Sequence, residues 1–196
     1  MELHTLAAGD DYRAEVGRAL AHNHAYCARH GYRYHVHRRA PSTRPPAWYK
    51  IPIMHRALKR GAWAAWIDAD CLIVDQEKPL TEFVDPAYDL TFAPGQMAIN
   101  AGVWIASPRP WTREFLRLVW HDPLWAAPGR ILWEQQRILQ LYEADALNCR
   151  RHIRLVDRED WYDGRFILHL SGRHRFPQIW GAGALHTAID EALARS

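Results

Sequence analysis

An apolar segment that runs into two closely spaced acids constrains this chain more than any other feature. Residues 62–67 read AWAAWI, then come Asp68 and Asp70 around one alanine, and residues 71–74 read CLIV. The pattern predicts a buried strand with two carboxylates in its middle, where ionised acids are costly unless a positive charge is bound. Since residues i and i+2 of a strand face the same side, both acids can converge on one hard divalent cation. The alternative is a strand-end turn in which each aspartate caps a backbone amide.

The composition is that of an ordinary globular protein. The 196 residues are 48% hydrophobic and 24% charged, with 25 basic against 22 acidic side chains and a net charge of +3. This excess is too small to indicate nucleic-acid binding. Because 22 of the 25 basic residues are arginine, whose guanidinium matches phosphate oxygens, an anionic small ligand is the better expectation.

The cysteines and the hydropathy pattern predict a cytoplasmic protein. Cys27, Cys71 and Cys149 are odd in number and lack metal-type spacing, which favours a reducing compartment over a disulfide framework. There is no apolar run of about 18 residues and no signal-peptide pattern, so we expect no membrane span.

Strand-like and helix-like segments alternate along the chain. After a first strand, Asp10 and Asp11 are candidate helix N-caps, and the helical spacing lasts until Gly31. The expected strands are 3–8, 32–37, the segment leading into residue 68, 88–93, 98–107, 153–156 and 166–170. The expected helices are 10–30, 52–59, 111–120, 132–142 and 187–194. The order predicts one α/β domain over residues 1–196, with a mostly parallel sheet flanked by helices and ligands beyond the carboxyl ends of its strands.

A second polar motif follows the last apolar strand. His169 ends that strand, and Gly172 permits a tight turn that presents Arg173 and Arg175. The imidazole could complete the cation site begun by the aspartates, and an arginine could neutralise a phosphate. The alternative is a hydrogen-bonded structural histidine.

Two further polar groups interrupt apolar segments. Asn100-Ala101-Gly102 lies within an expected strand, where the buried amide needs a partner, either a ligand hydroxyl or the backbone of a β-bulge or turn. Glu134 and Gln135 stand at the start of an expected helix, where helix capping is the simpler interpretation.

Taken in order, these motifs resemble retaining nucleotide-sugar glycosyltransferases of the GT-A fold, a Rossmann-like α/β architecture. The similarity is greatest to glycosyltransferase family 34, which contains fungal galactosyl- and mannosyltransferases and plant xylosyltransferases, and to the related glycogenin and lipopolysaccharide galactosyltransferase family. The segment Trp48-Tyr49-Lys50 resembles the former family, and the segment from Leu6 to Tyr12 resembles the latter.

The resemblance implies a metal site and a phosphate site. Asp68, Asp70 and His169 would hold Mn²⁺ or Mg²⁺, with Asp68 also near the ribose or the donor sugar. Arg175 would stabilise the leaving phosphate, and Gly172 would form the turn against the donor.

The resemblance also implies a donor site and a stereochemical outcome. Tyr12 would stack on the nucleobase of a nucleoside-diphosphate sugar, UDP rather than GDP, although the same tyrosine could instead only cover the first helix. The other residues assigned to the donor are Ala7, Asp10, Lys50, Asn100, Glu134 and Gln135. Gln135 or Glu134 beside the anomeric carbon would stabilise an oxocarbenium-like state, which implies transfer with retention to a carbohydrate, glycolipid or other hydroxyl acceptor. Asp11 departs from the pattern, because a relative has a neutral amide there.

Two other functions fit part of the pattern. A haloacid-dehalogenase-like, Mg²⁺-dependent phosphohydrolase also places two acids after an apolar strand, but it needs a later lysine, and no lysine follows Asp85. A non-catalytic nucleotide-sugar-binding module is the other alternative.

Overall fold

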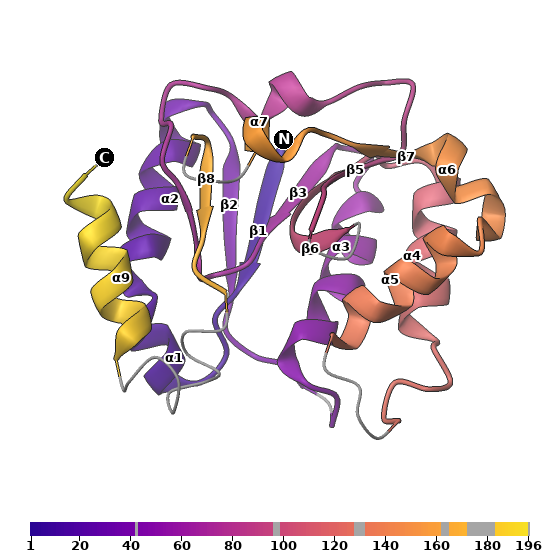
Figure 1. Cartoon of the computed structure of the whole chain (residues 1–196), viewed down its shortest axis with the longest axis horizontal. Helices are drawn as coiled ribbons and strands as arrows, with labels where there is room; N and C mark the ends of the chain where they lie inside the picture. The colour runs from indigo at the N-terminus through magenta and orange to yellow at the C-terminus, as the bar shows by residue number, and fades with distance from the viewer. Residues whose placement is uncertain (42, 96–98, 128–131, 162–164, 172–182, 196) are drawn as a thin grey trace.

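The computed structural model describes the chain except for residues 42, 96–98, 128–131, 162–164, 172–182 and 196. Its centre is a six-stranded sheet with the strand order β2-β1-β3-β6-β5-β7 (Figure 1). The strands are β1 (Glu2–Leu6), β2 (Arg33–His37), β3 (Ala64–Ile67), β5 (Leu90–Ala93), β6 (Asn100–Ala106) and β7 (Ile153–Leu155). A separate two-stranded sheet pairs β4 (Cys71–Ile73) with β8 (Ile167–His169).

The central sheet is mostly parallel, as predicted. Strand β1 is parallel to both β2 and β3, and β5 is parallel to β7. Strand β6 is antiparallel to its two neighbours, β3 and β5. Among the described strands of this sheet, β6 therefore runs against the other five.

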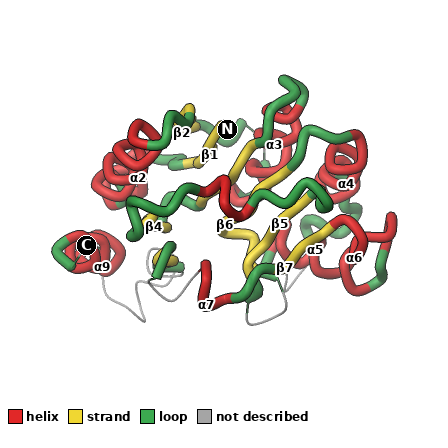
Figure 2. The backbone as a smooth tube through the Cα atoms, turned by 90° about the horizontal axis from the view of Figure 1, so that it is seen from above, coloured by secondary structure: helices red, strands yellow, loops and turns green. Residues whose placement is uncertain are grey.

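Helices cover both faces of the sheet. On one side lie α1 (Asp10–Glu15), α2 (Gly17–Arg29) and α9 (Ala184–Leu193), and on the other α3 (Lys50–Leu58), α4 (Pro110–Trp120) and α5 (Trp133–Glu143) (Figure 1). The short helices are η1 (Pro46–Tyr49), η2 (Leu80–Phe83), η3 (Ala146–Asn148), α6 (Cys149–His152) and α7 (Arg158–Trp161). Seen from above, α9 lies beside α2 and β4, and α4 to α6 gather at the opposite end of the sheet (Figure 2). Among the described helices, none is long and apolar enough to cross a membrane.

Successive apolar side chains of a strand contribute to two different cores, one on each face of the sheet. Ala64 and Trp66 of β3 pack with the cluster under α3, α4 and α5, whereas Ala65 and Ile67 pack with the cluster under α2. Successive side chains of a strand point to opposite faces, so an apolar run such as residues 62–67 supplies both cores at once. This is why the segment has no polar side until Asp68.

The first helix differs from its predicted form. The N-cap is Gly9, with φ of 92°, and Asp10 and Asp11 lie in the first turn of α1 without a side-chain capping bond. The helix is also interrupted at Val16, which separates α1 from α2. A positive φ is inexpensive for glycine, so Gly9 takes the position expected for an aspartate.

The prediction that Asp68 and Asp70 lie within one continuous strand was wrong. Strand β3 ends at Ile67, and the amide of Cys71 donates to the carbonyl of Asp68 at 3.0 Å, which closes a turn. The chain then leaves the central sheet and pairs with β8. The turn leaves the Asp68 side chain 29% exposed and the Asp70 side chain 16% exposed, so neither carboxylate is sealed inside the sheet.

Candidate active site

The small β4–β8 sheet brings the two predicted metal-binding motifs together. Cys71 pairs with His169 in its antiparallel register, and the amide of Leu170 donates to the carbonyl of Asp70 at 3.0 Å. As a result, Asp70 Oδ1 and His169 Nε2 lie 3.6 Å apart, with both side chains largely buried. Two residues far apart in the sequence therefore face each other beside the turn after β3.

Asp70 and His169 stabilise each other's charged forms. Burial by itself raises the pKa of Asp70 and lowers that of His169, but the interaction between the two groups reverses both effects. The pKa of Asp70 is below its usual value and the pKa of His169 is above it. A cation bound here would compete with the proton on His169.

The donor set at this position fits a divalent cation. A carboxylate and an imidazole are both ordinary ligands of Mn²⁺-like ions. Cys71 Sγ also lies within 4.8 Å of the ligand atoms of Asp70 and His169. However, burial raises the pKa of the Cys71 thiol well above its usual value, so the sulfur stays protonated and is a poor ligand for a hard ion.

The Asp68 carboxylate is held by side chains on the other side of the turn. Its Oδ1 accepts a hydrogen bond from Trp66 Nε1 at 2.7 Å and lies 3.0 Å from Lys50 Nζ. Sequence reasoning did not identify the role of Trp66. Strand periodicity contained the signal, because residues 66 and 68 have the i, i+2 spacing that places side chains on one side.

The buried side chain of Lys50 lies between the carboxylates of Asp68 and Glu134. Its side chain is 3% exposed, and its Nζ lies 3.0 Å from Asp68, 2.9 Å from Glu134 Oε1 and 3.0 Å from the carbonyl oxygen of Ala101. Although burial opposes the charge, the carboxylates of Asp68 and Glu134 raise the pKa of Lys50 above its usual value. The ammonium therefore stays charged and holds elements α3, β6 and α5 against the turn after β3.

Glu134 does not cap its helix. No side-chain capping bond is formed at the start of α5, and the carboxylate is 3% exposed and paired with Lys50. Burial raises the pKa of Glu134 despite the opposing effect of Lys50. Its second oxygen, Oε2, is buried and has no hydrogen-bond partner within the described part of the chain.

Asn100 and Gln135 support the backbone where the register between β5 and β6 shifts. The pairing of β5 with β6 shifts register after Phe92, so that Ala93 pairs with Asn100. Asn100 Oδ1 accepts from the amide of Gly102 at 2.7 Å, and Gln135 Oε1 accepts from the amide of Ala101 at 2.8 Å. This irregularity is consistent with the β-bulge or turn proposed as the alternative for this motif.

Tyr12 lies in the electrostatic field of both aspartates. Burial, followed by the charges of Asp70 and Asp68, raises the pKa of its phenol well above the usual value. Ala7 is fully buried after β1, and its amide donates to the carbonyl of His37 at 2.9 Å. Asp10 is exposed and pairs with Arg13 within α1, so it lies outside the buried group.

Two predicted residues fall outside the described part of the chain. Gly172 and Arg175 belong to residues 172–182, so their assignment to the phosphate stays a prediction. The structure brings Asp70 together with His169, and it brings Asp68, Lys50 and Glu134 together in an adjoining group.

Sequence comparison relates the chain to known glycosyltransferases. Residues 9–88 match the galactosyl transferase GMA12/MNN10 family, an interval that contains Lys50 and both aspartates of the turn. Probable glycosyltransferase 3 from Oryza sativa subsp. indica is 29% identical over 185 residues, an alignment that covers 82% of this chain and 38% of the rice protein. The chain therefore spans well under half the length of this curated relative.

Solved structures share the fold at low identity. A glycosyltransferase involved in the glycosylation of the major capsid of PBCV-1 superposes with a TM-score of 0.74 at 17% identity, covering 97% of this chain and 100% of that one. The galactosyltransferase LgtC, solved with donor and acceptor sugar analogs, superposes with a TM-score of 0.52 at 15% identity. The superposition covers 100% of this chain and 96% of LgtC. A Drosophila beta-1,4-galactosyltransferase 7 mutant, solved with manganese, UDP-Gal and xylobiose, superposes with a TM-score of 0.50 at 12% identity. The superposition covers 89% of this chain and 72% of the Drosophila chain.

The order of the motifs, the family match and the fold all relate this chain to the same group of proteins. This chain has the GT-A fold and is similar to glycosyltransferase family 34.

Proposed function

We propose that this chain transfers a sugar from a nucleoside-diphosphate sugar to an acceptor hydroxyl, with Mn²⁺ or Mg²⁺ bound and with retention of the anomeric configuration. The observation that carries the proposal is the pairing of Asp70 with His169 at 3.6 Å, next to the buried Lys50–Asp68–Glu134 group. Asp70 and His169 supply ligands for a cation, and the Lys50–Asp68–Glu134 group supplies polar atoms suited to a sugar. The manganese and UDP-Gal bound to the Drosophila structure of the same fold support this assignment.

The metal part of the proposal assigns Asp70, His169 and Asp68 as protein ligands. When bound, the cation would neutralise the negative charge that develops on the departing diphosphate. Lys50 and Trp66 fix the orientation of Asp68. A ligand whose rotamer is held by such partners loses little freedom on binding.

The sugar part of the proposal relies on Glu134 and Asn100. Glu134 Oε2 is a buried acceptor without a partner in the described structure, so a hydroxyl of the donor sugar would satisfy it. Lys50 prevents Glu134 and Asp68 from repelling each other and the donor. Gln135 holds the backbone at Ala101 through its side-chain oxygen, and Asn100 is the neighbouring residue on β6.

We base retention on the arrangement of the acids around Lys50. Lys50 holds one oxygen each of Asp68 and Glu134, so we assign both carboxylates to holding the turn and the donor rather than to deprotonating the acceptor. We propose that the acceptor oxygen bonds to the anomeric carbon on the face from which the phosphate oxygen leaves. The leaving diphosphate oxygen then accepts the proton of the acceptor hydroxyl.

The metal assignment is tested by thermal shift with UDP- and GDP-sugars, with and without Mn²⁺. We expect stabilisation that requires Mn²⁺ and is larger for UDP-sugars. Asp70→Ala should abolish the Mn²⁺-dependent shift and leave the melting curve of the free protein cooperative. The control is Glu191→Ala, which removes an exposed acid on α9. An unchanged Mn²⁺-dependent shift in Asp70→Ala would overturn the assignment.

The reaction is tested separately from binding. Proton NMR of the first product formed from an α-linked sugar nucleotide should show an α-linkage. A β-linked product would mean that Glu134 or another acid acts as a general base, and retention would be wrong. Release of phosphate from simple phosphomonoesters would instead favour the phosphohydrolase.

A further inference from the structure

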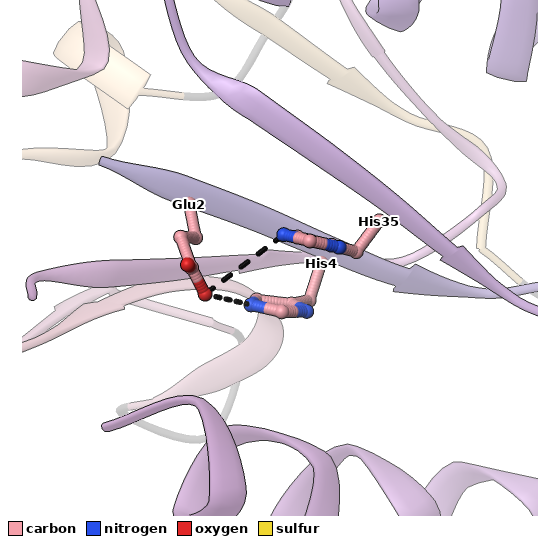
Figure 3. Close-up of side chains that lie close together, drawn as sticks. All are labelled: Glu2, His4 and His35. Carbon is pink, nitrogen blue, oxygen red and sulfur yellow. Dashed lines mark hydrogen bonds and ion pairs between the residues drawn. The ribbon is translucent and has the colours of Figure 1, made fainter. Parts of the chain in front are cut away.

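A second group of metal-ligating side chains lies on strands β1 and β2, away from the β4–β8 sheet. In the parallel register His4 pairs with His35, and Glu2 is two residues before His4 on the same face. Glu2 Oε2 lies 3.3 Å from His4 Nε2 and 3.9 Å from His35 Nε2 (Figure 3). The three ligand atoms all lie within 4.8 Å of one another.

The group is buried at one end and reaches solvent at the other. The side chains of Glu2 and His4 are 3% and 2% exposed, whereas His35, on the edge strand β2, is 38% exposed. An ion can therefore enter from the side of His35. The sheet face under α3 is otherwise packed with apolar residues such as Ala64 and Trp66, so packing alone does not account for a carboxylate and two imidazoles here.

One atom of the group lacks a hydrogen bond. His35 Nε2 is buried and has no hydrogen-bond partner in the described part of the chain, although its ring as a whole is partly exposed. The nitrogen points toward Glu2 and lies on the same side of the group as His4 Nε2 (Figure 3). An unpartnered buried nitrogen is costly unless something occupies its lone pair or takes its proton.

We propose that Glu2, His4 and His35 bind a transition-metal ion of the Zn²⁺ class. Zinc lies about 2.0–2.2 Å from nitrogen and oxygen ligands, which places the ligand atoms of a tetrahedral site about 3.4 Å apart. Glu2 Oε2 is already 3.3 and 3.9 Å from the two nitrogens. The two imidazoles are stacked with centroids 4.6 Å apart, so they must turn toward each other to ligate one ion. Two imidazoles and one carboxylate, with a position left for water, form a known zinc ligand set.

Neighbouring side chains provide outer-shell support. His37 Nε2 lies 3.2 Å from His4 Nδ1, and a hydrogen bond at that nitrogen fixes the tautomer and orientation of a ligating histidine. Burial, together with the rings of His35 and His37, lowers the pKa of His4 to about 4. At neutral pH this imidazole is therefore uncharged, the form that binds metals.

Two arginines compete with the ion for the carboxylate. Arg33 and Arg60 both form ion pairs with Glu2, and together with Arg56 they make the surroundings positive. Their side chains are 69% and 47% exposed, so each can withdraw into solvent when an ion binds. The competition predicts that removal of Arg60 strengthens metal binding, the opposite of what a purely structural ion-pair network would show.

The proposed site differs in chemistry from the one at Asp70. Imidazole ligands favour Zn²⁺ over Mn²⁺, and the ion would link edge strand β2 to β1 rather than contact a diphosphate. The experiment uses the 196-residue chain with Asp70→Ala, which removes one of the ligands proposed for the candidate active site. Zn²⁺ affinity is measured by competition with a chromogenic chelator after the protein has been stripped with EDTA.

We expect the Asp70→Ala protein to bind one equivalent of Zn²⁺. Adding His35→Ala should weaken that binding by at least about 100-fold, since loss of an outer-shell partner alone costs about 10–100-fold. Adding His121→Ala, which removes an exposed histidine, should leave the affinity unchanged. Adding Arg60→Gln should increase it.

Two results would overturn the proposal. One is an Asp70→Ala protein that binds no zinc, and the other is a His35→Ala double variant with unchanged affinity and a native circular dichroism spectrum. If the His35→Ala variant does not fold, Co²⁺ is added to the Asp70→Ala protein instead. The visible absorption bands of Co²⁺ ligated by histidine support the site, and a spectrum of hydrated Co²⁺ refutes it. Neither outcome depends on the glycosyltransferase reaction.

Discussion

The imidazole of His169 occupies the space that a side chain on residue 102 would need. A Cβ built on Gly102 would overlap His169 Cε1 and lie 2.9 Å from its Nδ1 and from Asn100 Oδ1. The carbonyl of Gly102 also accepts the amide of Asp68 at 2.7 Å. Gly102 therefore contacts Asn100 within β6, the turn at Asp68 and the ring of His169.

Replacement of this glycine should therefore damage the proposed metal site without unfolding the protein. We expect Gly102→Ala to displace the His169 ring and weaken Mn²⁺-dependent nucleotide binding by about 10–100-fold, as loss of ligand orientation does. Isothermal titration calorimetry with UDP and Mn²⁺ measures the effect. Gly17→Ala is the matched control, because a Cβ there meets nothing within 4 Å. Equal affinities in the two variants would show that the position of His169 does not matter.

Lys50 should contribute strongly to stability. Lys50→Met leaves Asp68 and Glu134 without their shared cation, and breaking a buried ion pair on one side costs about 3–5 kcal/mol. Urea unfolding measures the free energy of unfolding. Lys59→Met, at an exposed lysine following α3, should change it by less than about 0.5 kcal/mol. We expect the double variant Lys50→Met/Glu134→Gln to recover part of the loss, because one stranded charge is removed, and a further loss would contradict this account.

Tyr12 should bind the nucleobase through its ring rather than its hydroxyl. We expect Tyr12→Ala to weaken UDP binding by about 1–3 kcal/mol, as for other base–aromatic stacks, and Tyr12→Phe to leave it nearly unchanged. The ring also packs against the core that contains Val16 and Ala19, so both variants are compared by thermal unfolding. A loss of stability in Tyr12→Ala with no loss of UDP affinity would support the alternative that Tyr12 only covers the first helix.

The buried thiols should be unreactive in the native protein. Burial raises the pKa of Cys27 to about 12, and burial with the charge of Asp145 raises that of Cys149 to about 11. Since the thiolate is the nucleophile, iodoacetamide at pH 8 should label these residues at least about 100-fold more slowly than in guanidinium-unfolded protein. Mass spectrometry of tryptic peptides separates the three cysteines. Native labelling of Cys27 at the unfolded rate would contradict its burial.

The local pattern of the sequence predicted the main elements because each carries its own signal. The apolar segment before Asp68 specifies a strand buried on both faces, and the 3.6-residue spacing of apolar side chains specifies helices such as α4 and α5. The exceptions are short elements. Strand β4 has three residues, too few for periodicity to separate it from the strand before it, so the aspartate turn was misread as continuous strand.

By itself, the sequence determined the alternation of strands and helices, the mostly parallel sheet, and the residue types available for a cation and a nucleoside diphosphate. Only the tertiary structure decided which of them meet. Asp70 reaches His169 because β4 and β8 pair in one register, and Lys50 reaches Glu134 because α3 and α5 pack on the same side of the sheet. The grouping of His4 with His35 likewise depends on the parallel register of β1 and β2. Such contacts arise from strand register and helix packing between distant segments, and no local pattern encodes either one.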